Sequence, residues 1–258
     1  MQTAFSRRVF LKNTTLSTAG AFLLPAFAKR SAVAKKRITI QAVNANFERE
    51  PLRRPFGFKG SAMTEVWQIV AALESDSGIR KVGLGTQNVL WSDAQVFAIH
   101  SENGGNALMC AMTEYALQQA KGKTFTDPIQ LLDDLLEDVL AYGQKITGNP
   151  KLRKTFALNA LVPVDNAAWL LFAEANGFQT FDDMLPAAYR PALSHRHDKV
   201  ASIPALGYGT PIEEIKSMAD DDFFIMKIKT GAPGTQAEML EKDKEFLKAI
   251  HEAIGHYE

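Results

Sequence analysis

The alternation of short strand and helix patterns after residue 199 constrains the fold of this chain more than any other feature. A strand pattern at 200–203, a helix at 211–219, a strand at 223–229 and an amphipathic helix at 236–254 follow one another. Strands that alternate with helices in this way lie parallel and are joined by right-handed crossovers. We therefore expect two parallel strands, each followed by a helix, in the last part of the chain.

The preceding part has a different organisation. Residues 37–43 alternate as a strand does, and residues 63–74 and 79–84 predict two more strands around the turn Ser-Asp-Ser-Gly at 75–78. Two prolines and two glycines make 51–60 loop-like. This pattern predicts a small antiparallel meander.

Three helix patterns follow the meander. Apolar spacing predicts a helix at 106–120 and another that begins at Pro128, capped by Asp127, and ends near Ile146. A third helix is expected from about 152 to 175, with a kink or break at Pro163. The fold class is therefore α/β, with a mixed α+β part before the strand–helix alternation.

The amino terminus resembles a bacterial twin-arginine export signal. Arg7 and Arg8 stand before Phe-Leu-Lys, an apolar stretch follows, and Ala26-Phe27-Ala28 has the small-x-small form of a cleavage site. We expect residues 1–28 to be a signal peptide cleaved after Ala28, and residues 29–36 a linker. The resemblance implies the twin-arginine export machinery as a partner and a periplasmic or exported location, whereas the alternative is a basic start that arises by chance.

Composition excludes several classes of protein. The 258 residues hold 29 Lys and Arg against 29 Asp and Glu, so the chain is not a strongly basic nucleic-acid binder. The single cysteine, Cys110, excludes an intramolecular disulfide framework and any multi-cysteine metal site. No apolar run reaches the roughly 20 residues of a membrane-spanning helix.

The pattern Lys227-Ile228-Lys229 is the most informative for chemistry. Side chains alternate along a strand, so Lys227 and Lys229 share one face with their Cα atoms about 7 Å apart. Burial and like charge both lower the pKa of a lysine, and a neutral lysine can accept a proton from carbon. The alternative is an edge strand whose lysines face solvent.

The order of these features resembles the enolase superfamily, in its mandelate racemase and muconate-lactonizing group. Residues 37–198 are similar to that family's capping domain, and 199–258 to the start of its (β/α) barrel. The stretch Pro51-Leu52-Arg53-Arg54-Pro55-Phe56 resembles the loop that covers the substrate, as in dipeptide epimerases. Ala167 to Leu171 resembles the end of the capping helices, and Lys227-Ile228-Lys229 stands where the family has its K-x-K.

The resemblance implies a mechanism. Lys229 would remove the proton next to a substrate carboxylate, Lys227 would tune that base, and Arg53, Arg54 and Phe56 would contact the substrate. Mg²⁺ would hold the enolate. The implied substrate is a small carboxylate, such as an amino-acid derivative or a dipeptide. Elimination of water from an acid sugar and cycloisomerisation stay open within the family, as does assembly into a homo-oligomer.

Two departures from the family keep other functions open. Thr86 follows Gly83-Leu84-Gly85, where most members have a glutamate. The family's three acidic metal ligands lie on later barrel strands, and the 60 residues from 199 to 258 compare with about 250 for an eight-fold barrel. We therefore expect a front part of a longer enzyme. The alternatives are an inactive fragment or ligand-binding capping-domain protein, and an unrelated α/β binding protein with an incidental K-x-K.

Three further segments carry weaker signals. Two histidines share a face in 195–198 and could bind a metal, the acidic run 220–222 precedes a strand, and the Gly-containing start of a helix at 101–106 could bind an anion. We expect the first two to be solvated connections. The third lacks the Gly-Lys-Ser/Thr ending of a phosphate-binding loop.

Overall fold

The computed structural model describes residues 35–257. The predicted signal peptide, residues 1–28, lies outside the described residues, as does the 29–34 part of the predicted linker. The predicted cleavage after Ala28 therefore stays a prediction.

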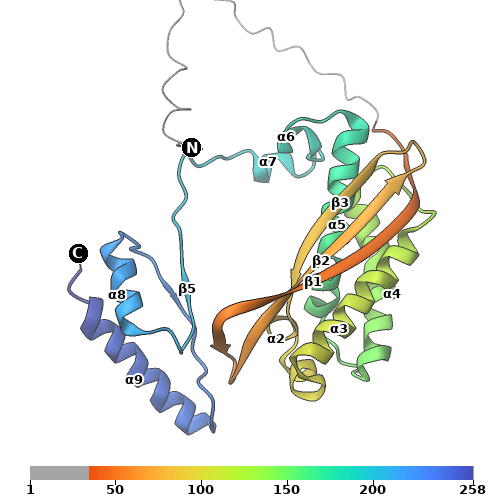
Figure 1. Ribbon diagram of the computed structural model, residues 1–258. Helices are drawn as coiled ribbons and strands as arrows, with labels where there is room; N and C mark the ends of the chain where they lie inside the picture. The colour runs from red at the N-terminus through yellow and green to blue at the C-terminus, as the bar shows by residue number, and fades with distance from the viewer. Residues whose placement is uncertain (1–34, 258) are drawn as a thin grey trace, which may run out of the picture. The chain divides into compact units, whose positions relative to one another are not determined.

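A four-stranded antiparallel sheet comes first, and its strand order is β3-β2-β1-β4 (Figure 1). The strands are β1 (Ile38–Phe58), β2 (Ser61–Ser75), β3 (Arg80–Gln87) and β4 (Thr124–Phe125). β2 pairs with β1 on one side and with β3 on the other, so the predicted meander is confirmed.

The prediction of a loop at 51–60 is wrong. β1 continues to Phe58 because its backbone pairs again with β2 at Phe56, Gly57 and Phe58. The pairing register shifts between Pro51 and Phe56, and this irregular stretch accommodates the prolines, which cannot donate to a ladder. The result is a long hairpin whose end packs against α2, where Phe58 and Met63 form a buried cluster with Leu90.

Helices cover one face of the sheet (Figure 1). They are α2 (Val89–Ser92), α3 (Ala94–Ala120), α4 (Pro128–Thr147) and α5 (Lys154–Asn176). α3 packs on β1 and β2, α5 on β2 and β3, and α4 on the other two long helices. The main core lies between sheet and helices, with Leu73, Met109, Leu135, Phe156 and Phe172 fully buried.

Local signals set most helix ends. Asp127 caps α4 by accepting from the amide of Ile129 at 3.0 Å, and Gly148 ends it with φ of 63°, so the predicted helix is confirmed. α3 begins at Ala94, twelve residues before the predicted start at 106, because Asp93 accepts from the amides of Gln95 and Val96.

Pro163 does not break α5, contrary to expectation. A proline leaves the carbonyl four residues earlier without its helical donor. Here the Asn159 carbonyl accepts instead from Gln87 Nε2 at 3.2 Å. Gly83 and Gly85 of β3 let the helix approach closely, since a Cβ on Gly83 would lie 2.1 Å from the Pro163 carbonyl oxygen.

α5 is long and apolar enough to cross a membrane by length and composition alone. Eleven of its residues are buried, and the helix packs on β2 and β3. It therefore serves as a core helix of this fold.

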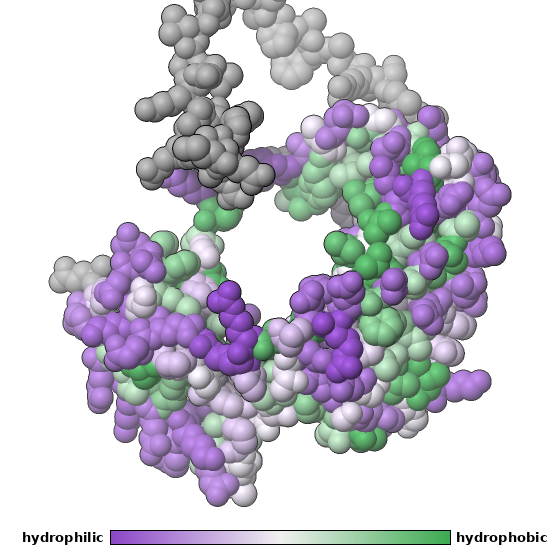
Figure 2. Space-filling view, viewed as in Figure 1, coloured by the Kyte–Doolittle hydropathy of each residue, from purple (hydrophilic) through white to green (hydrophobic). Residues whose placement is uncertain are grey.

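A second, smaller sheet follows the short helices α6 (Phe181–Met184) and α7 (Arg190–Leu193). β5 (Ala205–Leu206) pairs in parallel with β6 (Lys227–Ile228), and α8 (Ile212–Asp220) and α9 (Gln236–Ile254) follow these strands. Leu206, Ile215 and Ile250 form its core. Figure 2 shows mostly hydrophilic residues over the visible face of α9. The predicted parallel strand–helix alternation is confirmed, whereas the division into domains at 198/199 stays a prediction.

Both strand predictions in this part have wrong boundaries. Residues 200–203 form no strand, and Val200 is 84% exposed. Residues 223–226 are also irregular, and Phe224 is 82% exposed, so the strand predicted at 223–229 begins only at Lys227. The backbone pairing joins 204–206 to 227–229 and goes no further, because within residues 35–257 each of these two strands has only the other as a partner.

Candidate active site

The tip of the β1–β2 hairpin is a two-residue turn, Lys59-Gly60, and both residues have positive φ (54° and 75°). Such turns suit the twist of a hairpin, but a lysine in this conformation is strained. The tip is fixed by backbone contact, since the Gly60 amide donates to the Gly231 carbonyl at 2.8 Å. The loops after β5 and β6 therefore hold the hairpin tip.

Tyr208 provides a second anchor for the hairpin. Its hydroxyl donates to the Ser61 carbonyl, and its ring lies close against Gly57, where a Cβ would lie 2.3 Å from ring carbons. Burial, and then the charge of Asp243, raise the pKa of Tyr208, so this hydroxyl stays a donor.

Lys227 and Lys229 leave β6 on the face opposite its helices. Their amides donate to the carbonyls of Pro204 (2.9 Å) and Leu206 (2.7 Å), and Ile228 between them packs into the apolar cluster of α8 and α9. Lys227 is exposed, whereas Lys229 is half-buried and its Nζ lies 5.3 Å from the centre of the Phe58 ring. Lys229 thus follows directly after the strand, next to the hairpin tip.

Lys59 lies beside the same aromatic ring. Its Nζ is 5.7 Å from the Phe58 ring centre and donates to the carbonyls of Trp91 (3.2 Å) and Leu90 (3.4 Å) at the end of α2. Loss of water around the ammonium, followed by the charges of Arg153 and Lys229, lowers the pKa of Lys59. No motif in the sequence singles out Lys59. The Lys-Gly pair between two strand patterns was the available signal.

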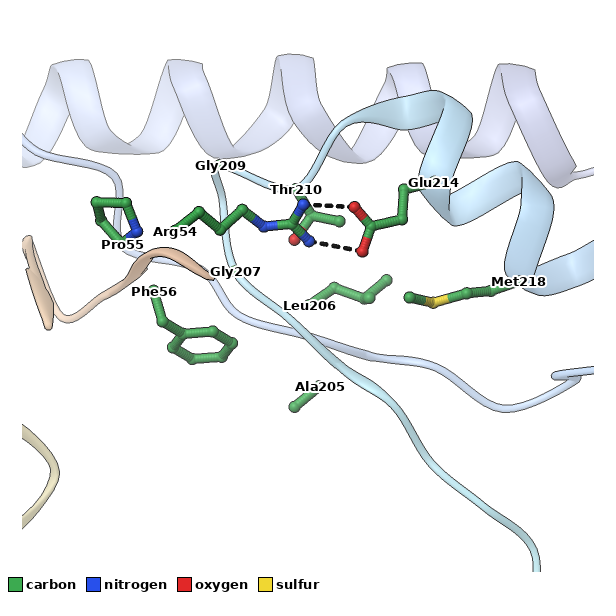
Figure 3. Close-up of a pocket in the computed structure, with 10 residues that line it drawn as sticks. All are labelled: Arg54, Pro55, Phe56, Ala205, Leu206, Gly207, Gly209, Thr210, Glu214 and Met218. Atoms are coloured by element: carbon green, nitrogen blue, oxygen red, sulfur yellow. Dashed lines mark hydrogen bonds and ion pairs between the residues drawn. The ribbon is translucent and has the colours of Figure 1, made fainter. Parts of the chain in front are cut away.

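The residues expected to contact substrate lie along the same hairpin (Figure 3). Arg54 and the Glu214 carboxylate of α8 form an ion pair, with Nη2 2.6 Å from Oε1, beside a cavity of about 70 Å³ that Phe56 also lines. This hydrogen bond raises the pKa of Arg54 and lowers that of Glu214. Arg53 is exposed, and Phe56 packs edge-on against Phe58 with ring centres 5.8 Å apart.

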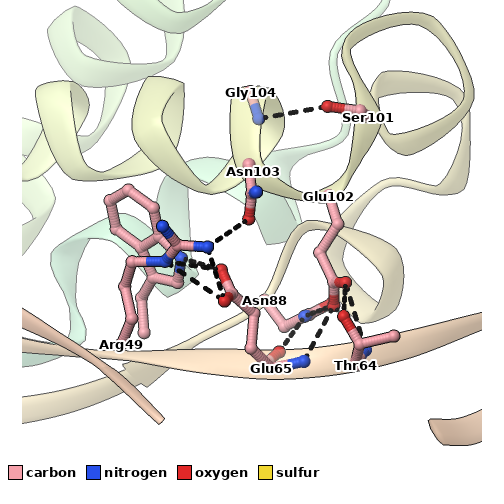
Figure 4. A network of polar contacts seen from close by, with 9 residues as sticks. Arg49, Thr64, Glu65, Asn88, Ser101, Glu102, Asn103 and Gly104 are labelled. Atoms are coloured by element: carbon pink, nitrogen blue, oxygen red, sulfur yellow. Dashed lines mark hydrogen bonds and ion pairs between the residues drawn. The ribbon is translucent and has the colours of Figure 1, made fainter. Parts of the chain in front are cut away.

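The 101–106 segment, which could have bound an anion, instead makes hydrogen bonds within the protein (Figure 4). Ser101 interrupts α3 with φ of 64°, and the next residue, Glu102, accepts from the Thr64 amide (2.9 Å) and from Asn88 Nδ2 (2.9 Å). Nearby, Arg49 and Glu65 form an ion pair of 2.8 Å. The Glu102 carboxylate thus tethers β2 to α3 just after the interruption at Ser101.

The described residues do not fit the implied Mg²⁺ ion. Mg²⁺ is held by carboxylate and other oxygen ligands. Within residues 35–257, no three His, Cys, Asp or Glu side chains gather in a position to hold a metal. The His195 and His197 rings are exposed and pack on each other with centres 4.5 Å apart, and Asp220 accepts from the Tyr257 hydroxyl.

Solved structures share this arrangement of elements. A dipeptide epimerase from Enterococcus faecalis V583, complexed with Mg and the dipeptide L-Leu-L-Tyr, matches 86% of this chain at 19% identity with a TM-score of 0.52. An L-talarate/galactarate dehydratase from Salmonella typhimurium LT2 matches 92% at 22% identity with a TM-score of 0.52. The L-Ala-D/L-Glu epimerase from Bacillus subtilis matches 85% at 16% identity with a TM-score of 0.51.

These likenesses define the fold. The described chain shares the fold of these solved structures, with an antiparallel sheet covered by helices and then parallel strands that alternate with helices. It covers 52%, 54% and 51% of the three neighbours, so it spans about half their length. No protein-family model and no curated protein matches the sequence.

Proposed function

We propose that the protein removes the proton from the carbon next to a carboxylate, with Lys229 as the base. The proposal rests above all on Lys229, which follows β6 on the face away from the helices and lies next to Phe58 of the covering hairpin. In (β/α) barrels the reacting groups stand at the carboxyl ends of strands. Neighbouring structures of this fold include epimerases and a dehydratase.

The proposed step moves one proton. Lys229 in its neutral form accepts the α-proton on Nζ, and the electron pair of the broken C–H bond moves into the substrate carboxylate. Lys227, two residues away on the same side of the strand, adds positive charge near the carboxylate. Return of a proton to the other side of the carbon would complete an epimerisation. Elimination of water from an acid sugar and cycloisomerisation begin with the same step.

The proposed substrate class is an amino-acid derivative or dipeptide, and the proposed cofactor is Mg²⁺. Two of the neighbours are epimerases, one of them complexed with a dipeptide and Mg, which supports this choice. Within residues 35–257 no three His, Cys, Asp or Glu side chains gather to hold the ion, so the steps above involve the two lysines alone. Export by the twin-arginine route and a periplasmic location are part of the same proposal, on the strength of Arg7 and Arg8.

Deuterium exchange tests this function directly. The full chain is incubated in D₂O with L,L-dipeptides and with aldaric acids, with and without Mg²⁺, and loss of the α-proton signal is followed by NMR. We expect exchange in the wild type and a loss of about a hundredfold or more in Lys229→Gln, as for removal of a general base. Lys248→Gln, at an exposed position of α9, is the matched control.

The second candidate is a ligand-binding protein without catalysis. The lack of a three-residue metal cluster within residues 35–257 favours it. Binding of a dipeptide without any exchange in the wild type would establish this candidate and overturn the first. Exchange that survives Lys229→Gln would assign the proton transfer to another residue.

A further inference from the structure

The outer side of β1 is an open strand edge over most of its length. β4 pairs with β1 only at 38–39, and Ile40 exchanges backbone bonds with residues 122–123. On its inner side β1 pairs with β2 from Ala42 to Pro51 without a shift in register. Within the part of the chain that the structure describes, no strand pairs with the outer side of β1 beyond Ile40.

Alternate residues of this edge direct their backbone groups outward. In an antiparallel pair, every second residue turns both its N–H and its C=O away from the partner strand. The Phe47 amide donates to the side chain of its neighbour Asn46 at 2.8 Å, which places Phe47 among the outward residues. By the same alternation Val43 and Ala45 are outward too. Their two amides and two carbonyls are therefore directed to the position of a further strand.

A groove lies beside this part of the edge. It has a volume of about 420 Å³, and Val43 and Ala45 line it on the side of β1. Tyr115 of α3 and Tyr142 of α4 also line it, with their rings stacked 4.1 Å apart between centres. Binding sites for small ligands have volumes of about 300–1,000 Å³, so the groove has room for a short stretch of extended chain.

Glu114 sets the charge of this groove. Its side chain is exposed on α3, and it is the one charged residue among the described residues that line the groove. A carboxylate beside aromatic rings favours a lysine or an arginine, because the carboxylate pairs with the charge and the rings cover the aliphatic stem. The groove therefore suits a basic segment of chain.

A second copy of this chain fits the edge less well. Symmetric pairing of two β1 edges would bring the Glu114 side chains of both copies into one interface, and no cation among the described lining residues offsets them. Like charges that meet across an interface oppose association. A peptide with a basic side chain would instead neutralise the carboxylate.

We propose that the outer edge of β1 binds an extended peptide segment of another protein, which adds as a strand beside 43–45 and directs a lysine or arginine to Glu114. In strand addition, main-chain hydrogen bonds give the affinity and side-chain contacts give the specificity. The residues of this site are separate from Lys227 and Lys229, so the inference does not depend on the proposed reaction.

Fluorescence anisotropy of labelled peptides with the full chain tests the charge preference. The probes are capped heptapeptides of alternating threonine and valine that carry either lysine or glutamate at the central position. We expect the lysine peptide to bind about fivefold more tightly than the glutamate peptide, the size of an exposed ion pair. Glu114→Gln should remove this preference. Glu252→Gln, at an exposed position of α9, is the matched control and should keep it.

N-methylated peptides test the strand addition itself. An extended peptide has two edges, and two versions of the lysine peptide carry N-methyl groups on the amides of one edge or of the other. Methylation of the edge that faces β1 removes main-chain bonds and should weaken binding about tenfold. Methylation of the other edge should leave the affinity close to that of the parent peptide.

Each contrary result overturns the proposal at a definite point. A failure of all the peptides to bind, or a lysine preference that is absent or survives Glu114→Gln, overturns the assigned partner. Equal binding of the two N-methylated versions overturns strand addition. A dimer of the wild type in sedimentation velocity that Ala45→Pro dissociates would assign the edge to a second copy, since proline removes one outward amide. Circular dichroism establishes that the variants are folded.

Discussion

Cys110 lies in a small apolar cluster with Trp67 and Ile69, and its side chain is buried. Burial, and then the charge of Glu114, raise the pKa of its thiol from 9.0 to about 11. At pH 8 the folded protein should thus hold about a hundredfold less thiolate than the unfolded chain. We expect iodoacetamide to label Cys110 slowly in the native state and fast in urea, which mass spectrometry can follow.

The same shift makes stability depend on pH. Below pH 9 the thiol is protonated in both the folded and the unfolded state, so its full contribution to the free energy of unfolding is present. Between pH 9 and 11 the unfolded chain releases the proton first, and the free energy of unfolding falls as pH rises. Urea unfolding at pH 8 to 10.5 should show a shallower decline in Cys110→Ala than in the wild type. Identical declines would contradict the assigned shift.

At the scale of elements, the contact between β3 and α5 depends on glycine. A Cβ on Gly83 would lie 2.1 Å from the Pro163 carbonyl oxygen and 2.3 Å from the Ala167 amide nitrogen. Both are backbone atoms, so Gly83→Ala can be accommodated only if the helix moves away from the sheet. We expect a loss of about 1–3 kcal/mol or more in the free energy of unfolding, measured by urea denaturation.

Gly104 offers the matched control inside a helix. A Cβ there would meet its nearest atoms, in His100 and Ser101, at 3.5 Å, which is ordinary contact. Gly104→Ala should therefore be neutral or stabilise the protein by up to about 1 kcal/mol, because alanine is the better helix former. Equal losses in the two variants would show that the close approach of α5 is not what Gly83 provides.

Element boundaries were predictable where the signal is local. Asp127, Pro128 and Gly148 delimit α4, because caps act within a single turn. The pairing of 56–58 was missed because prolines at 51 and 55 predict a loop, whereas the partner strand imposes the pairing. Strand ends near 200 and 223 were wrong for a related reason, since a parallel strand ends where its partner's backbone turns away.

The candidate site also combines features that neighbouring residues set with contacts between residues far apart in the sequence. Alternation along the chain predicted that Lys227 and Lys229 share a face, because this depends on neighbouring residues alone. The partner of Arg54 is Glu214, 160 residues away, and Lys59 and Lys229, at a similar separation, lie beside the same Phe58 ring. No periodic pattern encodes such pairs, so only the folded chain reveals them.

At the scale of the whole molecule, three polar contacts among the described residues hold the hairpin against the β5–β6 part. They are the Arg54–Glu214 ion pair, the Tyr208–Ser61 hydrogen bond and the Gly60–Gly231 backbone bond. The Arg54–Glu214 ion pair depends on charge and is exposed, so it should weaken as the salt concentration rises. The Debye screening length is about 3 Å at 1 M salt. Opening of the hairpin should therefore be faster in high salt.

Charge reversal makes this prediction specific. Arg54→Glu should speed amide exchange at Gly60 by about two- to fivefold, because two carboxylates then face each other and the neighbouring backbone bond opens more often. The double variant Arg54→Glu/Glu214→Arg restores opposite charges and should return the rate toward that of the wild type. Hydrogen exchange with mass spectrometry on the peptide that contains Gly60 measures the exchange rate in the single and the double variant. A rate that does not respond to either variant would mean that Tyr208 and the backbone bond alone hold the hairpin over Lys229.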